Sequence, residues 1–309
     1  MTAVVQDNAA WREATATLSV LIPFLRDDPT ALLRQLDREA AAVAGTAEIV
    51  LLDDGTGDQK LTDSLSRTIS AMALPTRRIT LTANEGRARG RNRLTAAARG
   101  RWFLFLDSDM KPDRADFLHA WTTLIDHDPA VAFGGFSLDQ APRDAVFAVH
   151  RALSGASECL PAAERVKAPE KYVYTSNLLV RRDVFAAEAF DPGFVGWGWE
   201  DVEWAMRVSR RFPILHVDNP ATHMGLDTAA DLARKYDQGA ANFARVARLH
   251  PEILRTYPSH RLARAMRRLP ARTALRAILR RAAVGRILPV RARAFALRLY
   301  RAAVYAEAL

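Results

Sequence analysis

Five consecutive apolar residues, Trp102–Leu106, run directly into the acidic triplet Asp107-Ser108-Asp109. A short apolar run that ends so abruptly predicts a strand buried on both faces of an α/β sheet. Ligands of such sheets gather outside the carboxyl ends of the strands, where two carboxylates at this spacing can reach one hard cation. A lone triplet of this kind also fits an acidic turn before a helix, so other segments must decide between the two interpretations.

Apolar runs alternate with helical patterns through the first half of the chain. Besides the run above, strands are predicted at residues 17–23, 48–52, 78–82, 130–138, 173–180 and 214–217. Helices are predicted from residue 28 onward, at residues 87–99 and at residues 200–211. This βαβαβ alternation predicts a doubly wound, Rossmann-like α/β fold, with a mostly parallel sheet and helices on both of its faces.

The composition narrows the class of protein. The 309 residues, 49% of them hydrophobic, can fill one large α/β domain with an appendage. Cys159 is the only cysteine, which excludes an intrachain disulfide framework and a site built from several thiolates, and indicates a reducing compartment. Residues 1–16 lack the pattern of a secretory signal, and no apolar run reaches the roughly 18 to 20 residues of a spanning helix. We therefore expect a cytoplasmic protein.

The net charge of +9 is unevenly distributed along the chain. Residues 260–309 contain thirteen arginines and a single acid, Glu307, so this stretch carries +12 and residues 1–259 carry −3. Apolar residues recur there at helical spacing from Leu275 onward, which predicts amphipathic helices broken near Gly285 and Pro289. The predicted organisation is an N-terminal extension (1–16), an α/β domain (17–227), a helical segment (228–257) and an Arg-rich amphipathic helical tail (258–309).

Two further loops offer groups that suit a nucleotide. Asp53 and Asp54 follow the second predicted strand, where carboxylates can accept hydrogen bonds from a uracil N–H and from ribose hydroxyls. An ordinary Asp-Gly turn is the competing interpretation. Arg87, Arg91 and Asn92 open a predicted helix, and helix N-termini and arginines both favour anions such as a diphosphate. A solvated basic helix face explains these cations equally well.

The segment Gly196-Trp197-Gly198-Trp199 leads directly into Glu200 and Asp201. Tryptophan faces pack against the apolar side of a sugar ring, and glycines allow a loop to close over a ligand. A carboxylate at the start of the following helix either caps the turn or serves as a base. Two tryptophans beside two acids favour the functional interpretation.

His223 follows the last predicted strand. A solitary histidine is usually structural, but this one would join Asp107 and Asp109 in a mixed nitrogen and oxygen site. Such a site suits Mn²⁺ better than Mg²⁺, which prefers oxygen ligands and water.

Taken together and in this order, these segments resemble the GT-A glycosyltransferases of family 2. The matching segments are residues 20–24, 52–58, 84–92, 106–109, 175–177 and 181–185. Residues 196–201 are similar to the acceptor-side motif of β-1,4-galactosyltransferases and bacterial chondroitin-type polymerases. The resemblance covers residues 17–225; Leu94 departs from the family, which often has glycine there, and the Arg-rich tail matches nothing in the family core.

The resemblance implies a GT-A catalytic domain at residues 17–227. It implies an inverting, metal-dependent glycosyltransferase that moves a sugar from a nucleotide-diphosphate sugar, for which we expect a UDP-sugar, to a glycan or lipid-linked acceptor. Such an enzyme would act in surface polysaccharide or glycoconjugate synthesis.

The roles that follow from the resemblance are specific to named residues. Asp201 would be the catalytic base, and Glu200 would orient the acceptor. Asp107, Asp109 and His223 would hold Mn²⁺ or Mg²⁺. The residues expected to contact sugar are Trp197, Gly198 and Trp199. The residues expected to contact the nucleotide sugar are Pro23, Phe24, Asp53, Asp54, Arg87, Arg91, Asn92, Asp107, Ser108 and Asn177.

Two other classes of protein compete with this interpretation. A sugar-1-phosphate nucleotidyltransferase would need a glycine-rich, lysine-containing loop after the first strand, and residues 24–28 offer none. A non-enzymatic protein could bind membranes or nucleic acid through its basic tail, but Phe295, Tyr300 and Tyr305 are the only aromatic residues there, so we expect no nucleic-acid partner. Neither competitor explains the tryptophan-rich acidic loop.

The Arg-rich tail suggests a location on the inner face of the cell membrane. Its arginines and its apolar helix side would dock on an anionic bilayer, where lipid-linked acceptors are presented. The alternative is that these helices pack on the mildly acidic body or form a dimer. The donor sugar, the acceptor, the linkage and the oligomeric state stay open at this point.

Overall fold

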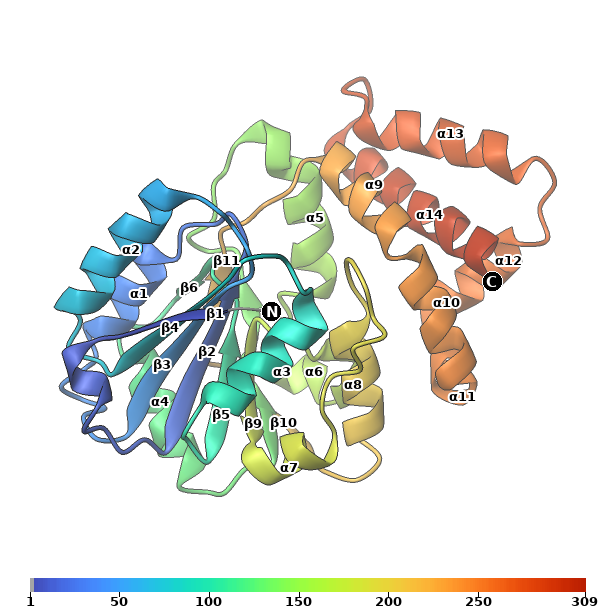
Figure 1. Cartoon of the computed structure of the whole chain (residues 1–309). Helices are drawn as coiled ribbons and strands as arrows, with labels where there is room; N and C mark the ends of the chain where they lie inside the picture. The colour runs from blue at the N-terminus through green and yellow to red at the C-terminus, as the bar shows by residue number, and fades with distance from the viewer. Residues whose placement is uncertain (1–2) are drawn as a thin grey trace.

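An eight-stranded sheet lies at the centre of the computed structural model, which describes residues 3–309 (Figure 1). Its strands lie in the order β1-β4-β3-β2-β5-β9-β7-β10. In chain order they are β1 (Ala3–Asp7), β2 (Leu18–Phe24), β3 (Ala47–Asp53), β4 (Thr76–Leu81), β5 (Trp102–Leu106), β7 (Val131–Phe133), β9 (Asn177–Arg181) and β10 (Ile214–His216). The inner strands β4, β3, β2 and β5 are parallel, whereas β1 and β9 pair antiparallel with their neighbours. The predicted mostly parallel α/β sheet is confirmed.

Side chains of the central strands alternate between two apolar layers, as the period of a strand requires. In β5, Trp102, Leu104 and Leu106 face one layer, whereas Phe103 and Phe105 face the other. The first layer contains α1 (Thr30–Asp37), α2 (Gln59–Ala71) and α4 (Phe117–Ile125). The second contains α3 (Arg87–Ala97), α7 (Arg182–Ala187) and α8 (Glu200–Val208). Burial on both faces explains why the strand sequences are continuously apolar.

The strand predicted at residues 130–138 is interrupted in the structure. Gly134 and Gly135 separate β7 from β8 (Phe136–Ser137), and Gly135 has a φ of 99°, a conformation that favours glycine. A Cβ at Gly134 would collide with the side chain of Asn177, so the chain needs glycine where it leaves the sheet. The strand predicted from residue 173 begins only at Asn177.

A second, three-stranded sheet lies beside the carboxyl end of β5. Its order is β6-β11-β8, in which β6 is Met110–Pro112 and β11 is Ala221–His223. The β6 and β11 strands pair antiparallel, with His223 opposite Met110. This register brings a residue from late in the chain next to the acidic triplet.

Residues 229–309 form a helical unit, seen in orange and red at one side of the sheet domain (Figure 1). Its helices are α9 (Ala229–Gln238), α10 (Ala240–Leu249), α11 (Pro251–Leu254), α12 (Pro258–Met266), α13 (Arg272–Val284) and α14 (Val290–Ala308). The long α14 packs on α9, α10, α12 and α13 and also on α5 (Ala148–Ser157) of the body. The predicted helix break near Gly285 and Pro289 is confirmed.

The remaining short elements are η1 (Ala9–Trp11), η2 (Ala145–Phe147), α6 (Ala162–Arg165) and η3 (Pro169–Tyr172). No helix within residues 3–309 is both long enough and apolar enough to cross a bilayer.

Candidate functional site

The acidic triplet after β5 lies beside His223 of β11. The Nε2 atom of His223 is 3.1 Å from Oδ2 of Asp109. Burial opposes ionisation of Asp109, but the hydrogen bond and charge of His223 outweigh it and lower the pKa of this carboxyl. Burial also works against the charged form of His223, and the Asp109 carboxylate reverses that effect and raises its pKa. A Cβ at Gly225 would collide with the Asp109 carboxylate, so glycine is needed for this close approach.

The third predicted metal ligand, Asp107, is bonded elsewhere. Its Oδ1 accepts a hydrogen bond from Nη2 of Arg91 at 3.0 Å. Over residues 3–309, no three His, Cys, Asp or Glu side chains are gathered closely enough to hold a metal ion. The donor atoms of Asp107, Asp109 and His223 nevertheless have the chemistry of a mixed site that Mn²⁺ accepts. A metal bound here would take the place of the Asp109–His223 hydrogen bond and would have Asp107 as a further ligand.

Arg91 links the acidic triplet to Glu200 at the start of α8. It is 2% exposed, and its Nη1 lies 3.2 Å from Oε1 of Glu200 while its Nη2 holds Asp107. Burial disfavours the charged guanidinium, but Asp107 and Glu200 outweigh burial and raise the pKa of Arg91. Arg87 is an exposed cation in the first turn of this helix, with a side chain that is 48% exposed and an Nη1 that lies 4.0 Å from Oε1 of Glu200.

A loop with unusual backbone angles leads into α8. Gly196, Gly198 and Trp199 all have positive φ values, of 81°, 85° and 76°. Such a conformation is strained for tryptophan and persists only where neighbouring contacts impose it. The indole Nε1 of Trp199 donates to the hydroxyl of Tyr305 in α14 at 3.0 Å, and Asn242 of α10 donates to the carbonyl of Gly198 at 2.9 Å. The C-terminal helices therefore hold this loop in place.

The two loop tryptophans also pack on the C-terminal helices. Trp197 lies 6.0 Å from Tyr236, and Trp199 lies 5.1 Å from Phe243, measured between ring centroids. Both tryptophans stay partly exposed. The surface that we predicted to stack on sugar is thus shared with the contact between the catalytic domain and the helical unit.

Asp201 lies in the first turn of α8, where the helix N-terminus favours a carboxylate. Its Oδ1 accepts a hydrogen bond from the backbone N–H of Val202 at 2.8 Å. Burial, followed by the negative charge of Glu200, raises the pKa of Asp201 to about 7 even though Arg91 opposes the shift. A carboxylate that titrates near neutrality is suited to take a proton from a substrate. Glu200 differs, because its Oε1 is already engaged with Arg91.

Asp53 and Asp54 are bonded to the protein's own backbone. Asp53 accepts a hydrogen bond from the N–H of Thr56 at 2.8 Å. Asp54 accepts from the N–H groups of Glu85 and Gly86, at 2.8 and 3.2 Å, and so holds the start of α3. These contacts fit the Asp-Gly turn that is the alternative to a nucleotide contact.

Asn92 and Asn177 are held in the same way. The Asn92 amide donates to the carbonyl of Phe190 at 2.9 Å and accepts from its N–H at 3.2 Å. Asn177, at the start of β9, is fully buried and donates to the carbonyls of Gly135 and Asn219 at 3.0 and 2.9 Å. In this structure both side chains join segments of the chain around the site.

Three further residues that we predicted to contact the nucleotide lie at the carboxyl ends of β2 and β5: Pro23, Phe24 and Ser108. The Phe24 ring is buried in the apolar layer, and its carbonyl accepts the N–H of Asp54 at 2.9 Å. Pro23 is partly buried and Ser108 is buried. Both lie at the sheet edge where a nucleotide is expected.

Asp27 is a further carboxylate near the acidic triplet, and no motif in the sequence pointed to it. Burial, followed by the charge of Asp109, raises the pKa of this carboxyl, while Arg87 and Lys235 oppose the shift. Asp27 therefore belongs to the same group of charges as the acidic triplet. Its position just after β2, at the same sheet edge as Asp107, was the signal that could have identified it. Lys235 comes from α9 of the helical unit and lies 2.6 Å from Asp227, so no local motif pointed to it.

Known proteins share this fold. The Glycosyl transferase family 2 signature matches residues 19–186, and no curated protein matches the chain. A mannosyltransferase, PcManGT from Pyrobaculum calidifontis in complex with GDP-Man and Mn²⁺, superposes with a TM-score of 0.59 at 17% identity over 94% of this chain and 87% of that one. The TarS 1–349 structure from S. aureus with UDP gives a TM-score of 0.50 at 16% identity over 92% and 89%. Because the family signature spans more than half of the chain, this protein belongs to glycosyl transferase family 2 and is a glycosyltransferase.

Proposed function

We propose that the protein is an inverting, metal-dependent glycosyltransferase in which Asp201 is the catalytic base. The supporting observation is a carboxylate at the start of α8 whose pKa is raised to about 7 by burial and by Glu200. It lies beside Glu200, which Arg91 ties to the acidic triplet after β5. A proton acceptor and a candidate diphosphate site are thus joined by one buried arginine.

In the proposed reaction, Asp201 takes the proton of the acceptor hydroxyl while that oxygen attacks the anomeric carbon of the donor sugar. The new C–O bond forms on the face opposite the diphosphate, and the bond to the diphosphate breaks with its electrons leaving on the nucleotide. A single displacement of this kind inverts the anomeric centre. Glu200, held by Arg91, would orient the acceptor, and Trp197, Gly198 and Trp199 would contact sugar.

Asp107, Asp109 and His223 would hold Mn²⁺ or Mg²⁺. When bound, the metal neutralises charge that develops on the departing diphosphate. The adjacency of Asp109 and His223 supports this assignment, and the similar mannosyltransferase structure contains Mn²⁺. Arg87 is exposed at the same place and would contact the diphosphate oxygens.

For the donor we propose a nucleotide-diphosphate sugar, with a UDP-sugar as the first choice, and for the acceptor a glycan or lipid-linked saccharide. The similar structures contain GDP-Man in one case and UDP in the other, so both nucleotides belong in the test. The test measures nucleotide release from a panel of UDP- and GDP-sugars with and without Mn²⁺. Release from at least one donor that depends on the metal supports the proposal. Failure to bind or cleave any donor, or full turnover in a chelator, would overturn it.

We also propose that the helical unit docks on an anionic membrane surface. Its α14 packs on α5 of the body, which agrees with the alternative to membrane docking. However, α13 lies on the outer side of the unit (Figure 1). Three apolar side chains of this arginine-rich region are exposed: Ile278 of α13 (65%), Ile287 between α13 and α14 (97%) and Phe295 of α14 (62%). Each arginine near an anionic surface contributes about 1 kcal/mol to binding, and inserted apolar side chains add to this.

Sedimentation with anionic and neutral vesicles tests the docking. Ile287→Asp combined with Phe295→Asp should release the protein from anionic vesicles and leave transfer to a soluble acceptor intact. Val4→Asp, at a residue of β1 that is 65% exposed, is the matched control and should stay bound. Native protein that ignores anionic vesicles at low salt would refute the docking.

A further inference from the structure

We infer that Arg301 of α14 binds a negatively charged group on the acceptor, a carboxylate or a phosphate, so that the acceptor is an anionic carbohydrate. This inference rests on the proposed function, because it takes residues 197–201 as the acceptor side. It adds a specificity-determining residue from a helix that lies outside the matched family segment.

Arg301 differs from the other arginines of the tail. Most of them are exposed, whereas Arg276, Arg293 and Arg301 are partly buried. Arg276 pairs with Glu307, and Arg293 donates to the carbonyl of Ala283 at 3.1 Å. Across residues 3–309, the side chain of Arg301 forms neither a hydrogen bond nor an ion pair. Since a guanidinium has five N–H donors and loses water on burial, a partly buried one without a partner has unused binding capacity.

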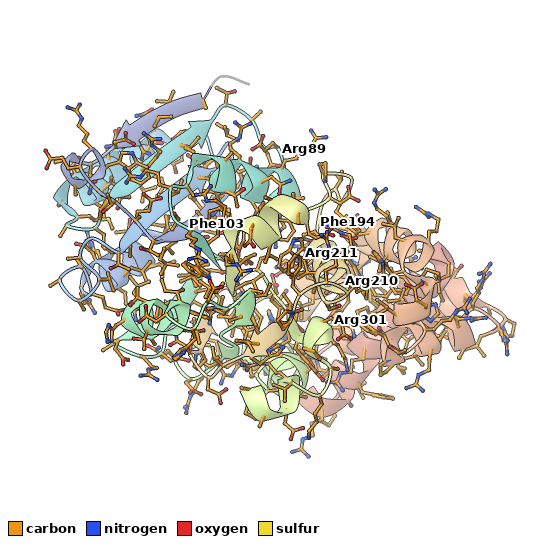
Figure 2. All side chains as sticks on the ribbon, turned by 90° about the horizontal axis from the view of Figure 1, so that it is seen from below. Arg89, Phe103, Phe194, Arg210, Arg211 and Arg301 are labelled. Atoms are coloured by element: carbon orange, nitrogen blue, oxygen red, sulfur yellow. The ribbon has the colours of Figure 1, made fainter. Side chains whose placement is uncertain are left out.

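Aromatic residues connect Arg301 to the acceptor-side loop. Its guanidinium carbon lies 5.4 Å from the ring centroid of Tyr236, which in turn lies 6.0 Å from Trp197. One helical turn further along α14, on the same helix face, Tyr305 accepts the hydrogen bond of Trp199. Figure 2 labels Arg301 where the C-terminal helices meet the catalytic domain. Arg301 is therefore next to the residues that hold both loop tryptophans.

Tyr174 relates Arg301 to the proposed base. Burial raises the pKa of the Tyr174 hydroxyl, the charges of Glu158 and Asp201 raise it further, and Arg301 opposes them. The charges of Asp201 and Arg301 thus both affect the pKa of the Tyr174 hydroxyl. Glu158 is the carboxylate whose charge raises the pKa of Arg301, and the two side chains are not hydrogen-bonded.

The chemistry of this group of residues matches a sugar with a negative charge. A planar guanidinium binds carboxylate and phosphate oxygens with two parallel hydrogen bonds, and tryptophan and tyrosine rings pack on the apolar face of a sugar. A cation–π contact with Tyr236 alone would leave the guanidinium donors unused. The donor diphosphate is the other candidate anion, but Arg87 is the exposed arginine beside the acidic triplet.

Tryptophan fluorescence of the full chain tests the inference without turnover, since Trp197 and Trp199 lie beside the site. Native protein is titrated with D-glucuronate, glucose 6-phosphate and the neutral methyl glucoside, and separately with UDP and Mn²⁺. At least one anionic sugar should bind about tenfold more tightly than methyl glucoside. Which of the two does so distinguishes a carboxylate from a phosphate acceptor.

Two arginine variants test whether Arg301 causes the preference for anionic over neutral sugars. Arg301→Gln should abolish the preference for the anionic sugar and leave UDP binding unchanged. Arg298→Gln removes the same charge from an exposed position on the same helix and should retain the preference. If Arg301→Gln does not fold, Arg301→Lys is tested in its place, because it keeps the positive charge. A preference for the anionic sugar that is weakened but still present in Arg301→Lys supports the inference.

Three results would overturn it. Equal binding of anionic and neutral sugars by native protein, or by Arg301→Lys, removes the basis for an anionic acceptor. Loss of UDP binding in Arg301→Gln would assign this arginine to the donor. Loss of the preference in Arg298→Gln would show a general effect of tail charge. A failure of the proposed function is recognised separately, as absence of nucleotide-sugar binding by native protein.

Discussion

The two sides of the site differ in how their charged groups are paired. On the side of the acidic triplet, Asp109 is bonded to His223 and Asp107 to Arg91. On the side that we propose to receive the acceptor, the Asp201 side chain accepts one hydrogen bond within the described residues, from the N–H of its neighbour Val202, and its pKa is raised to about 7. Arg301, from the opposite end of the chain, has no bonded partner among the described residues.

This difference suggests two kinds of role. The paired carboxylates are held in a fixed geometry, whereas Asp201 has the raised pKa that suits proton transfer. Paired carboxylates keep their charge and geometry in the absence of substrate, which suits residues that must receive a cation and a diphosphate. An unpaired, desolvated carboxylate has a raised affinity for protons, which suits a base. Arg91 forms ion pairs with Asp107 and Glu200, whereas Asp201 has no ion-pair partner within residues 3–309.

Replacing the poised carboxylate should have the largest effect. Asp201→Asn keeps the shape but removes the proton acceptor, so we expect kcat to drop by about 10² to 10⁴ while donor binding persists. Steady-state transfer and calorimetric donor binding measure the two quantities. Glu200→Gln is the matched control, and if it lost more activity than Asp201→Asn, the two roles would have to be exchanged.

The same variant should not lose stability. A carboxyl whose pKa is higher in the folded than in the unfolded state contributes stability that is present at low pH and is lost as the pH rises toward about 7. Asp201→Asn removes this pH-dependent loss, so we expect its melting temperature at pH 8 to equal or exceed that of native protein. A lower value would mean that Asp201 is a structural cap.

On the paired side, His223→Ala should weaken donor binding in the presence of Mn²⁺ by about 10- to 100-fold. The reason is that Asp109 loses the neighbour with which it would share a metal. Isothermal titration with UDP and Mn²⁺ measures the change, and the exposed His127→Ala is the control. Unchanged affinity, with turnover that resists a chelator, would remove His223 and Asp109 from the metal assignment.

The pH dependence of turnover compares the two sides in the native enzyme. Because the base must be deprotonated and its pKa is about 7, kcat should rise by about tenfold between pH 6 and pH 8. In Glu200→Gln the midpoint should move to lower pH, because Glu200 is the charge that raises the pKa of Asp201. A flat native profile over this range would contradict Asp201 as the base.

The smallest effect is expected at the contact between loop and tail. Tyr305→Phe removes the acceptor of the Trp199 indole N–H, which should cost about 1 kcal/mol and lower kcat a few-fold through a looser loop. Tyr300→Phe is the control on the same helix, because it loses bonds to Asp237 instead. It should reduce the free energy of unfolding without changing kcat. Equal effects of both changes on kcat would show that the tail acts only through stability.

The sequence by itself determined the sheet and most of the site's parts. Short, continuous apolar runs that end in turn residues predict strands buried on both faces, and the carboxyl ends of parallel strands meet at one edge, so Asp53 and Asp107 were assigned to that edge correctly. The acidic helix start at Asp201 was also evident from residue types in order. Even the break between α13 and α14 followed from Gly285 and Pro289.

Only the tertiary structure decided which charged groups are paired. His223 reaches Asp109 through the register of a short antiparallel pair, and Arg91 reaches Glu200 across more than a hundred residues of chain. The strand β1 was missed because its pairing with β4 depends on a sheet edge that forms elsewhere. Arg301 resembled the twelve other arginines of residues 260–309, and only the packing of α14 against α5 and α9 separated it from them. Local patterns determine what each segment becomes, whereas pairing depends on contacts between segments far apart in the chain, which local patterns do not encode.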